Sequence, residues 1–298
     1  MNTWQILGIS WAGDVPSLLT RVDQNRTSEL VPLLGRKLSY RVRQRRVCLG
    51  HITYGESGPA YVDCHNDPGP APRCERCAAV ENVLAASMHQ AHKLGRAYVD
   101  RRHTAHLDNP HRLYLAAFPD GSLKVGTSVG SSGGVRLIEQ GAWLARYVAV
   151  ASDGYVVREL EDSVTTELSV VQAVSTRRKL HGLAHRVDDA VLQSALTTTT
   201  EQVHRLIASS ADGIDPVDVA WNNPCVDDDR WNGAAAYPLR LDRGNHVFSV
   251  AAVCGRVGLI ERASSTDRLL VDLGQMRGLE VEFGDVEPDA VEVQASLF

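Results

Sequence analysis

The central third of the chain has the most regular pattern of apolar and polar positions. An apolar run (RLYLAAF, 112–118) is followed by the turn sequence PDGS and by a second short run (LKVGT, 123–127). Asp-Gly supplies the positive φ angle that a tight turn requires, so this pattern predicts a β-hairpin. The pattern then predicts, in order, a short helix at 135–141, a strand at 145–150 and helices at 155–174 and 188–209. The threonines at 197–200 are weak helix formers and are expected to interrupt the last helix.

Both flanks of this region are predicted to be rich in strands. The first 47 residues have the pattern of short strands with turns, and in segment 37–47 apolar and basic side chains partly alternate, which is typical of a strand. Segment 78–94 contains neither proline nor glycine and repeats apolar residues at helical spacing, which predicts a helix. Towards the end of the chain the pattern predicts strands at 237–241, 246–253, 257–262, 269–273 and 279–283.

The composition is that of an ordinary globular protein. Apolar residues make up 44% of the 298 positions and charged residues 22%, which excludes a disordered or collagen-like chain. No apolar run approaches the roughly 18 residues that a membrane-spanning helix needs, so no membrane partner is expected. The N-terminus has no basic segment followed by an apolar one, and we therefore expect a cytoplasmic protein.

The charge is unevenly distributed although the net value is only −5. Segment 36–46 carries six basic residues and no acid, whereas segment 279–298 carries six acids and no base. This asymmetry favours an anionic partner such as nucleic acid for the N-terminal half. The candidate contacts are Arg41, Arg43, Arg45 and Arg46. The alternative is that these residues form the solvated face of a strand.

Four of the six cysteines lie within thirty residues: Cys48, Cys64, Cys74 and Cys77. The last two form a C-x-x-C knuckle, and four thiolates can complete a closed tetrahedral zinc site, which is structural because it has no open position. The surrounding segment, 55–72, is rich in Gly, Pro, Asp and Asn, so a metal would supply the stability that core burial cannot. Two alternatives stay open: His51 or His65 replaces one thiolate, or the C-x-x-C is a redox pair.

The hairpin and the helices after it resemble the GIY-YIG nuclease core. Arg112-Leu113-Tyr114 occupies the place of Gly-Ile-Tyr, and Lys124-Val125-Gly126 occupies that of Tyr-Ile-Gly ten residues later. Arg136 falls ten residues after Gly126, where the family has an arginine, and Glu161 fits the position of its metal-binding glutamate. More widely, the chain resembles a poorly characterised bacterial and archaeal family that joins cysteine clusters to such a core.

The resemblance implies a metal-dependent phosphodiesterase acting on DNA or RNA, in repair, defence or self-protection. Glu161 would bind Mg²⁺ or Mn²⁺, Arg136 would hold phosphate oxygens, and Tyr114 would orient or deprotonate water. Lys124 departs from the family, since it replaces the second tyrosine, and the first motif lacks its glycine. A histidine usual after the arginine is also absent, with Glu139-Gln140 there instead.

These departures leave two other functions open. One is a non-catalytic, zinc-containing protein that binds nucleic acid such as tRNA. The other is a transfer or related reaction on a small or tRNA-linked substrate, with Lys124 as base or nucleophile. The expected fold class is α+β: a zinc-bearing β module at 1–105, a GIY-YIG-like α/β core at 106–210 and a barrel-like β module at 211–298. The strands of the first and last modules are expected to share one barrel in an alternative division.

Overall fold

The chain folds into two compact units. The computed structural model describes residues 3–22, 28–55, 58–99, 101–130, 134–209, 213–224, 226, 229–262 and 267–290. The first unit consists of Met1–Gly50, Asp63–Cys77 and Asp228–Phe298, and the second consists of His51–Val62 and Ala78–Asp227. Each unit has its own sheet, and each is described by itself below.

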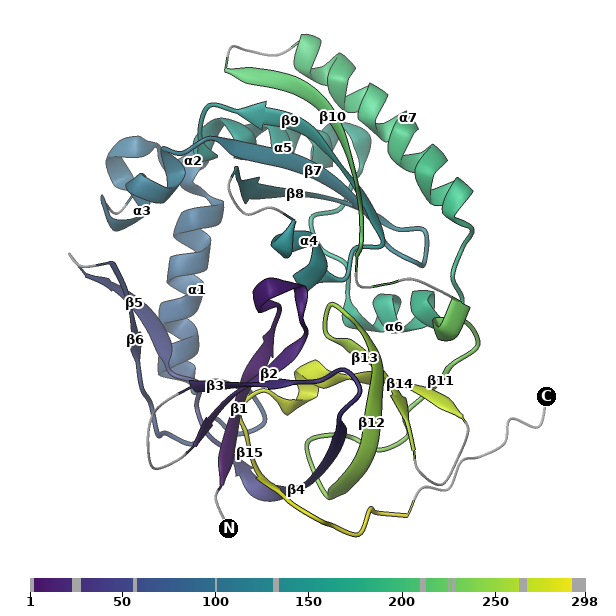
Figure 1. Ribbon diagram of the computed structural model, residues 1–298. Coiled ribbons are helices and arrows are strands. Elements are labelled where there is room, and N and C mark those ends of the chain that lie inside the picture. Colours follow the sequence, from purple (N-terminus) through teal and green to yellow (C-terminus); the bar gives the residue numbers. More distant parts are fainter. Residues whose placement is uncertain are drawn as a thin grey trace. The chain divides into compact units, whose positions relative to one another are not determined.

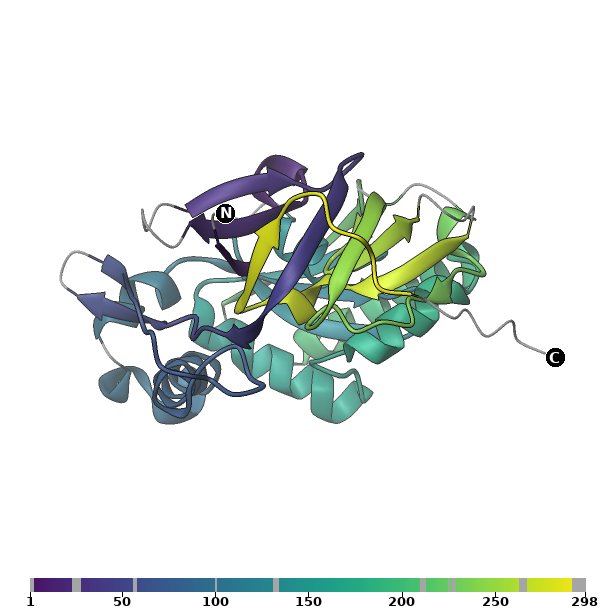
Figure 2. The same ribbon diagram turned by 90° about the horizontal axis from the view of Figure 1, so that it is seen from below.

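The first unit is built on a nine-stranded sheet with the order β11-β14-β13-β12-β4-β15-β1-β2-β3. Its strands are β1 (Trp4–Ser10), β2 (Ser17–Val22), β3 (Ser28–Pro32), β4 (Lys37–Arg46), β11 (Ala235–Ala236), β12 (Asn245–Cys254), β13 (Val257–Glu261), β14 (Arg268–Asp272) and β15 (Leu279–Phe283). Short 3-10 turns lie at Ala12–Asp14, Asp229–Trp231 and Leu273–Met276. β4 pairs antiparallel with both β12 and β15, and β1 pairs with β15. Strands from the two ends of the chain, purple and yellow, therefore lie side by side (Figures 1 and 2).

The alternation along β4 explains its place at the centre of this sheet. Leu38 and Tyr40 are buried, whereas Lys37 and Arg41, which flank this pair in the sequence, are exposed. The Tyr40 ring makes edge contacts with Phe248 on β12 and with Phe283 on β15. Period-two alternation places every second side chain on one face, so the apolar half of the strand enters the core.

The second unit contains a four-stranded sheet with the order β10-β9-β7-β8 and a separate two-stranded sheet, β5-β6. Its strands are β5 (His51–Gly55), β6 (Gly58–Val62), β7 (His111–Ala117), β8 (Leu123–Val129), β9 (Leu144–Ala151) and β10 (Ile214–Asn222). Its helices are α1 (Glu75–His89, whose first three residues belong to the first unit), α2 (Ala91–Leu94), α3 (Arg101–Leu107), α4 (Val135–Gln140), α5 (Gly154–Leu168), α6 (Thr176–Ala184) and α7 (Asp189–Ala208), with a 3-10 turn at Arg96–Tyr98.

The sheet of the second unit is buried on both faces at β7. Every residue of β7 from Leu113 to Ala117 is at most 1% exposed. Helices α5 and α7 contact β7 and β9 (Figure 1). Tyr114 and Ala116 share a core cluster with Leu137 of α4. A near-continuous apolar run is the expected sequence of a strand covered on both sides.

The structure confirms the α+β fold class and most of the predicted elements. The hairpin of β7 and β8 has the predicted bounds to within two residues, and α4 and β9 follow it as expected. Strands of the predicted modules 1–105 and 211–298 pair in one sheet, whose edges among the described residues are β11 and β3. The three-module division stays a prediction. Among the described residues no helix combines the length and the apolar character needed to cross a membrane.

Three details of the predicted elements are wrong, each for a local reason: the end of one helix, the interruption of another, and one strand. The helix predicted at 155–174 ends at Leu168, because Ser169 adopts a left-handed backbone conformation and Val171 then pairs with β8 through the Val125 amide. The helix at 188–209 is not interrupted by its threonines. The hydroxyls of Thr199 and Thr200 donate to carbonyls four residues earlier and stay within the helix.

The third error is the strand predicted at 237–241. In the structure the strand that pairs with β14 is β11, which ends at Ala236, before the predicted strand begins. Within the predicted segment, the Tyr237 amide adds one hydrogen bond to the Leu270 carbonyl. Pro238 follows, and a proline has no amide hydrogen to continue the ladder.

Candidate functional site

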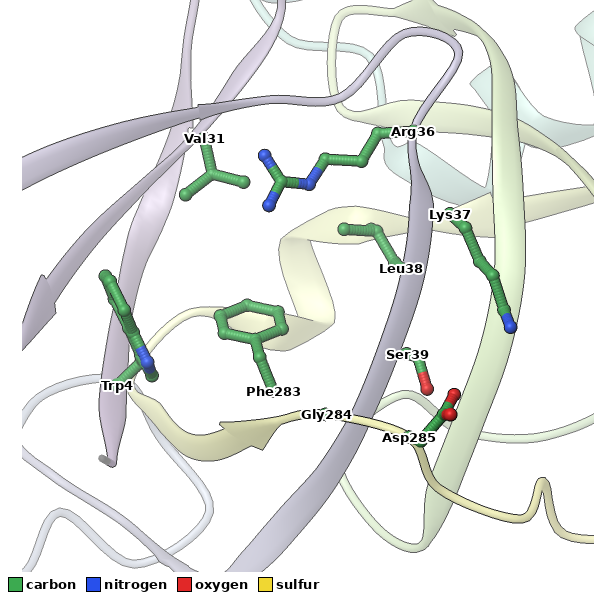
Figure 3. A pocket seen from close by; sticks show the side chains of 9 residues that line it. All are labelled: Trp4, Val31, Arg36, Lys37, Leu38, Ser39, Phe283, Gly284 and Asp285. Atoms are coloured by element: carbon green, nitrogen blue, oxygen red, sulfur yellow. The ribbon is translucent and has the colours of Figure 1, made fainter. Parts of the chain in front are cut away.

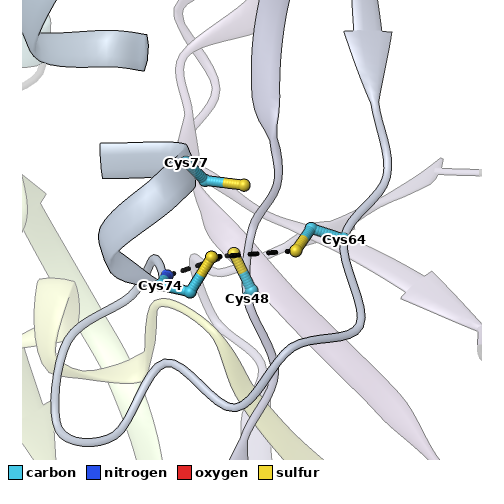
Figure 4. Close-up of side chains that lie close together, drawn as sticks. All are labelled: Cys48, Cys64, Cys74 and Cys77. Carbon is cyan, nitrogen blue, oxygen red and sulfur yellow. Dashed lines mark hydrogen bonds between the residues drawn. The ribbon is translucent and has the colours of Figure 1, made fainter. Parts of the chain in front are cut away.

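The four predicted cysteines meet in the first unit. Cys48 follows β4, Cys64 follows β6, Cys74 immediately precedes α1 and Cys77 lies in its first turn, with their side chains pointing toward one another (Figure 4). All four sulfur atoms lie within 4.8 Å of one another. This group contains neither His51 nor His65 among the described residues. The four cysteines could therefore hold a metal ion without a histidine.

Backbone amides support the sulfur atoms, as expected for metal-binding knuckles. The amides of Gly50 and Cys74 donate to the Cys48 sulfur at 3.4 and 3.2 Å. A hydrogen bond from the Cys77 amide lowers the pKa of the Cys74 thiol to about 6, whereas burial and the neighbouring thiols raise the pKa of Cys77. Since Cys48 and Cys77 are no more than 2% exposed, thiols alone would leave this cluster with weak internal bonding.

The second candidate site begins on the hairpin of the second unit. Tyr114 on β7 lies directly opposite Gly126 on β8, and Ala116 lies opposite Lys124. Residues two apart share a face, so Tyr114 and Lys124 project from the same side of the hairpin. A Cβ atom on Gly126 would lie 2.5 Å from Tyr114 Cζ, which is closer than real contacts allow. Glycine at 126 therefore makes room for the tyrosine ring.

Gln140, at the end of α4, joins these two side chains. Lys124 Nζ donates to Gln140 Oε1 at 2.6 Å, and Gln140 Nε2 donates to the Tyr114 hydroxyl at 2.8 Å. An ammonium group can only donate, so it fixes the amide with its oxygen towards Lys124 and its nitrogen towards Tyr114. The tyrosine hydroxyl is then an acceptor in this bond, and its own hydrogen remains available to another group.

Gln140 is a site residue that the sequence analysis did not identify. The family that the chain resembles usually has a histidine after the arginine, and this chain has Glu139-Gln140 there instead. A usable signal was present, because Gln140 stands four residues after Arg136 and so shares a helix face with it. The carbonyl of Gln140 also accepts a hydrogen bond from Lys179 Nζ at 2.6 Å, which brings a further cation to this helix end.

Glu161 on α5 is the buried carboxylate of this site. Its residue is 8% exposed, and its side chain lies 3.5 Å from the guanidinium of Arg158 one turn earlier. Arg158 in turn contacts His89 Nδ1 at 3.0 Å. Burial raises the pKa of Glu161, and the charges of Arg158, Lys124 and Arg136 oppose that shift. Glu161 is thus a carboxylate held within a group of cations.

Arg136 is the exposed member of the group. Its side chain is 55% exposed and lies 3.8 Å from Glu139 on the same helix. Burial, then the charges of Arg136 and Lys179, lower the pKa of Lys124 to about 8. Burial raises the pKa of Tyr114, so its phenol is protonated at neutral pH. The structure therefore brings together all four residues of the predicted catalytic set, with cations outnumbering the carboxylate.

The arginines of β4 have different environments from one another. Arg41 is exposed and donates to Asn245, and Arg43 lies 3.0 Å from Glu282. Arg46 points inward, where it lies 3.6 Å from Asp242 and donates to the Gln275 carbonyl at 3.0 Å. The side chain of Arg45 lies outside the described residues. Arg46 thus braces the sheet, whereas Arg41 and Arg43 face solvent.

Comparison with known proteins identifies a family for most of the chain. No curated protein matches the sequence. No solved structure matches it either. A family model described as "Protein of unknown function (DUF2797)" matches residues 35–239, which include both groups of side chains described above. The chain therefore belongs to the DUF2797 family.

Proposed function

We propose that the second unit hydrolyses phosphodiester bonds in nucleic acid, DNA or RNA, with chemistry of the GIY-YIG type. The observation that carries this proposal is the group formed by Tyr114, Lys124, Arg136 and Glu161. These residues come from β7, β8, α4 and α5, and the elements follow one another as strand, strand, helix, strand and helix. The order, and the residue types at Tyr114, Arg136 and Glu161, are those that the resemblance implied, whereas Lys124 stands in place of the family's second tyrosine.

The cations of the site supply phosphate binding. Arg136 is exposed enough to reach a substrate, and its planar guanidinium suits two phosphate oxygens. Lys124 acts as a point charge, because its ammonium form predominates below its pKa of about 8. Together they would stabilise the charge that develops on the phosphate in the transition state.

Tyr114 acts as a hydrogen-bond donor and not as a base. Its raised pKa keeps the phenol neutral at physiological pH. Because Gln140 Nε2 already donates to the hydroxyl oxygen, the hydroxyl hydrogen points elsewhere and can orient a water or a phosphate oxygen. The hydrogen-bonded amide holds the ring in place while this contact forms.

Glu161 fits the part of a divalent-cation ligand. Mg²⁺ is commonly held by one or two carboxylates together with substrate phosphates and water, so one buried carboxylate beside a phosphate site is sufficient. Mg²⁺ or Mn²⁺, when bound, polarises the phosphate and lowers the pKa of a water. Arg158 already neutralises Glu161, so the carboxylate must exchange this partner in part for the cation.

The test compares two glutamates of the same helix. Glu161→Gln removes the buried carboxylate, and Glu159→Gln removes an exposed carboxylate two residues away. Cleavage of a panel of DNA and RNA substrates with Mg²⁺ or Mn²⁺ should be abolished by the first change and retained by the second. Nucleic-acid binding and thermal unfolding should be unchanged in both. If the wild type binds these substrates and cleaves none, the non-catalytic binding function replaces this proposal.

A second function is favoured by the environment of Lys124. A lysine with a pKa near 8 has a substantial neutral fraction at mildly alkaline pH and can act as base or nucleophile. In that case the substrate is small or tRNA-linked, and the reaction is a transfer. Lys124→Arg separates the two functions, because arginine preserves a phosphate-binding cation and cannot be deprotonated. If Lys124→Arg keeps part of the wild-type activity, the result supports the phosphodiesterase. If the variant folds and has no activity, the result supports a reaction in which Lys124 is the base or nucleophile.

For the first unit, we propose that the cysteine cluster holds one structural zinc ion. Four thiolates that leave no open position are the usual ligand set of a structural zinc site. Elemental analysis of the purified protein should give about one zinc per chain. Iron as the main metal, with the colour of an iron–sulfur cluster, would contradict zinc. Absence of any metal, with the thiols reactive, would support the redox alternative.

A further inference from the structure

A cavity in the first unit lies away from the cysteine cluster. It has a volume of about 320 Å³ and opens between β1, β4 and β15, with the turn before β4 at its margin (Figure 3). This volume lies at the lower end of the range found for small-molecule sites. The cavity is lined by the two aromatic rings of Trp4 and Phe283, by aliphatic side chains, and by the polar side chains of Arg36, Lys37, Ser39 and Asp285, so that two cations face one carboxylate.

The aromatic walls are Trp4 on β1 and Phe283 on β15. Their ring centroids lie 5.9 Å apart at an angle of 71°, so the two rings meet edge to face. Both residues are partly exposed, in contrast to Tyr40, which is buried behind Phe283. Partly exposed aromatic rings at a cavity wall offer a surface on which a planar ring can stack.

Arg36 supplies a cation to the same cavity. Figure 3 shows its side chain reaching toward Val31, with Phe283 and Trp4 on the other side of the space. Among the described residues, the guanidinium of Arg36 has no hydrogen bond or ion pair, and the same holds for the neighbouring Lys37. Arg43 and Arg46, farther along β4, have the acidic partners Glu282 and Asp242. Arg36 and Lys37, which line the cavity, are therefore among the cations of segment 36–46 that remain available to a ligand.

We infer that this cavity binds one nucleotide unit, with its base against Trp4 and Phe283 and its phosphate on Arg36. A nucleotide combines the planar ring and the anion that the two kinds of wall require. Its source is either a free mononucleotide or one unit of a single strand, since both present the same chemistry. The site lies wholly within the first unit and does not depend on the reaction proposed for the second.

The test measures binding of three probes by titration calorimetry: AMP, adenosine and inorganic phosphate. AMP should bind at least about tenfold more tightly than either fragment, because only AMP uses both walls. Arg36→Ala should weaken AMP binding by about tenfold or more and leave adenosine binding nearly unchanged. Phe283→Leu should weaken both AMP and adenosine by about fivefold or more.

Arg268→Ala is the matched control. Arg268 is an exposed arginine on β14 of the same sheet that does not line the cavity, and its loss should change AMP binding less than twofold. Arg36 is exposed, so its substitution is compatible with folding and keeps the test valid if Phe283→Leu does not fold. Equal effects of Arg36→Ala and Arg268→Ala would overturn the inference, as would AMP binding no tighter than adenosine binding.

The source of the nucleotide is decided by a further titration with the trinucleotide AAA as RNA. Binding at least about tenfold tighter than that of AMP, and still dependent on Arg36, assigns the site to one unit of a strand. Equal affinities assign it to a free mononucleotide. Both outcomes support the site, whereas trinucleotide binding that is insensitive to both Arg36→Ala and Phe283→Leu would contradict it.

Discussion

The two groups of side chains differ in how their polar atoms are satisfied. The cysteine cluster brings four similar groups together at loop and helix ends, with few strong hydrogen bonds among them. The group around Lys124 is mixed, and Gln140 and Arg158 give its buried members partners from the protein itself. The first arrangement could hold a metal ion that would complete it, whereas the buried members of the second already have partners within the protein. Substitutions in the first should therefore act on stability, and substitutions in the second on function.

The largest effect is expected at Cys77. Cys77→Ser removes one of four ligands, so zinc content should fall and the free energy of unfolding should drop by about 4 kcal/mol or more. Elemental analysis and denaturant unfolding measure the two quantities. His65→Ala serves as the control, since His65 is exposed and outside the ligand group. Full zinc content in Cys77→Ser would remove the contrast between the two groups.

The next effect concerns Arg136, where function and stability should separate. Arg136→Ala should raise the barrier to cleavage by about 2–4 kcal/mol, because it removes a preorganised cation from the phosphate. Thermal stability should hardly change, since its pair with Glu139 is exposed. Arg205→Ala, an exposed arginine on α7, should alter neither the rate nor the stability. A loss of stability as large as the loss of rate would make Arg136 a structural residue.

A third substitution tests the packing beneath the second group. Gly126→Ala places a methyl group against the Tyr114 ring and should destabilise the protein by about 2 kcal/mol, as overpacking does. Gly284→Ala is the control, because an added Cβ there meets nothing within 4 Å. Urea unfolding measures both variants. Equal stabilities would mean that the Tyr114 ring moves freely and that its position is not fixed by this contact.

The smallest effect is a shift in pH dependence. If the Lys124 ammonium binds phosphate, activity should fall as pH rises through about 8, and if the neutral amine reacts, activity should rise through the same value. Gln140→Glu places a carboxylate beside Lys124 and should move this midpoint upward by about one unit. The pH–rate profiles of both proteins measure this. An unmoved midpoint would assign the titration to another residue.

Stability should respond to the same titration in a defined direction. The folded pKa of Lys124, about 8, lies below its ordinary value of 10.5. Between these values the unfolded chain binds more protons than the folded one, so this residue makes the fold more stable as pH rises from 8 towards 10.5. Near neutral pH the buried, charged lysine therefore lowers the stability of the second unit. The thiols of the first unit differ, because a bound metal would make them stabilising.

Local signals account for what could be predicted from the sequence. The C-x-x-C spacing and the Asp-Gly turn of the hairpin each depend on neighbouring residues, and both features are found as expected. The spacing of Gln140 from Arg136 could have indicated Gln140 as a site residue, but its hydrogen bonds reach residues 16 and 26 positions away, and that spacing does not reveal those partners. β10 went unpredicted because it is largely exposed and lacks apolar alternation. The cavity at Arg36 is formed by strands from both ends of the chain, so its ring pair could not be anticipated.

The pairing of the two ends has a consequence for the order of folding during synthesis. β4, at residues 37–46, must wait for partners at 245–254 and 279–283, whereas the second unit is complete by residue 227. Sheets with such distant pairings form slowly, because a long loop must close before the first contact is made. A ribosome-bound chain would therefore fold its second unit first, with the exposed edges of β4 open to aggregation or to chaperones until the last strand emerges.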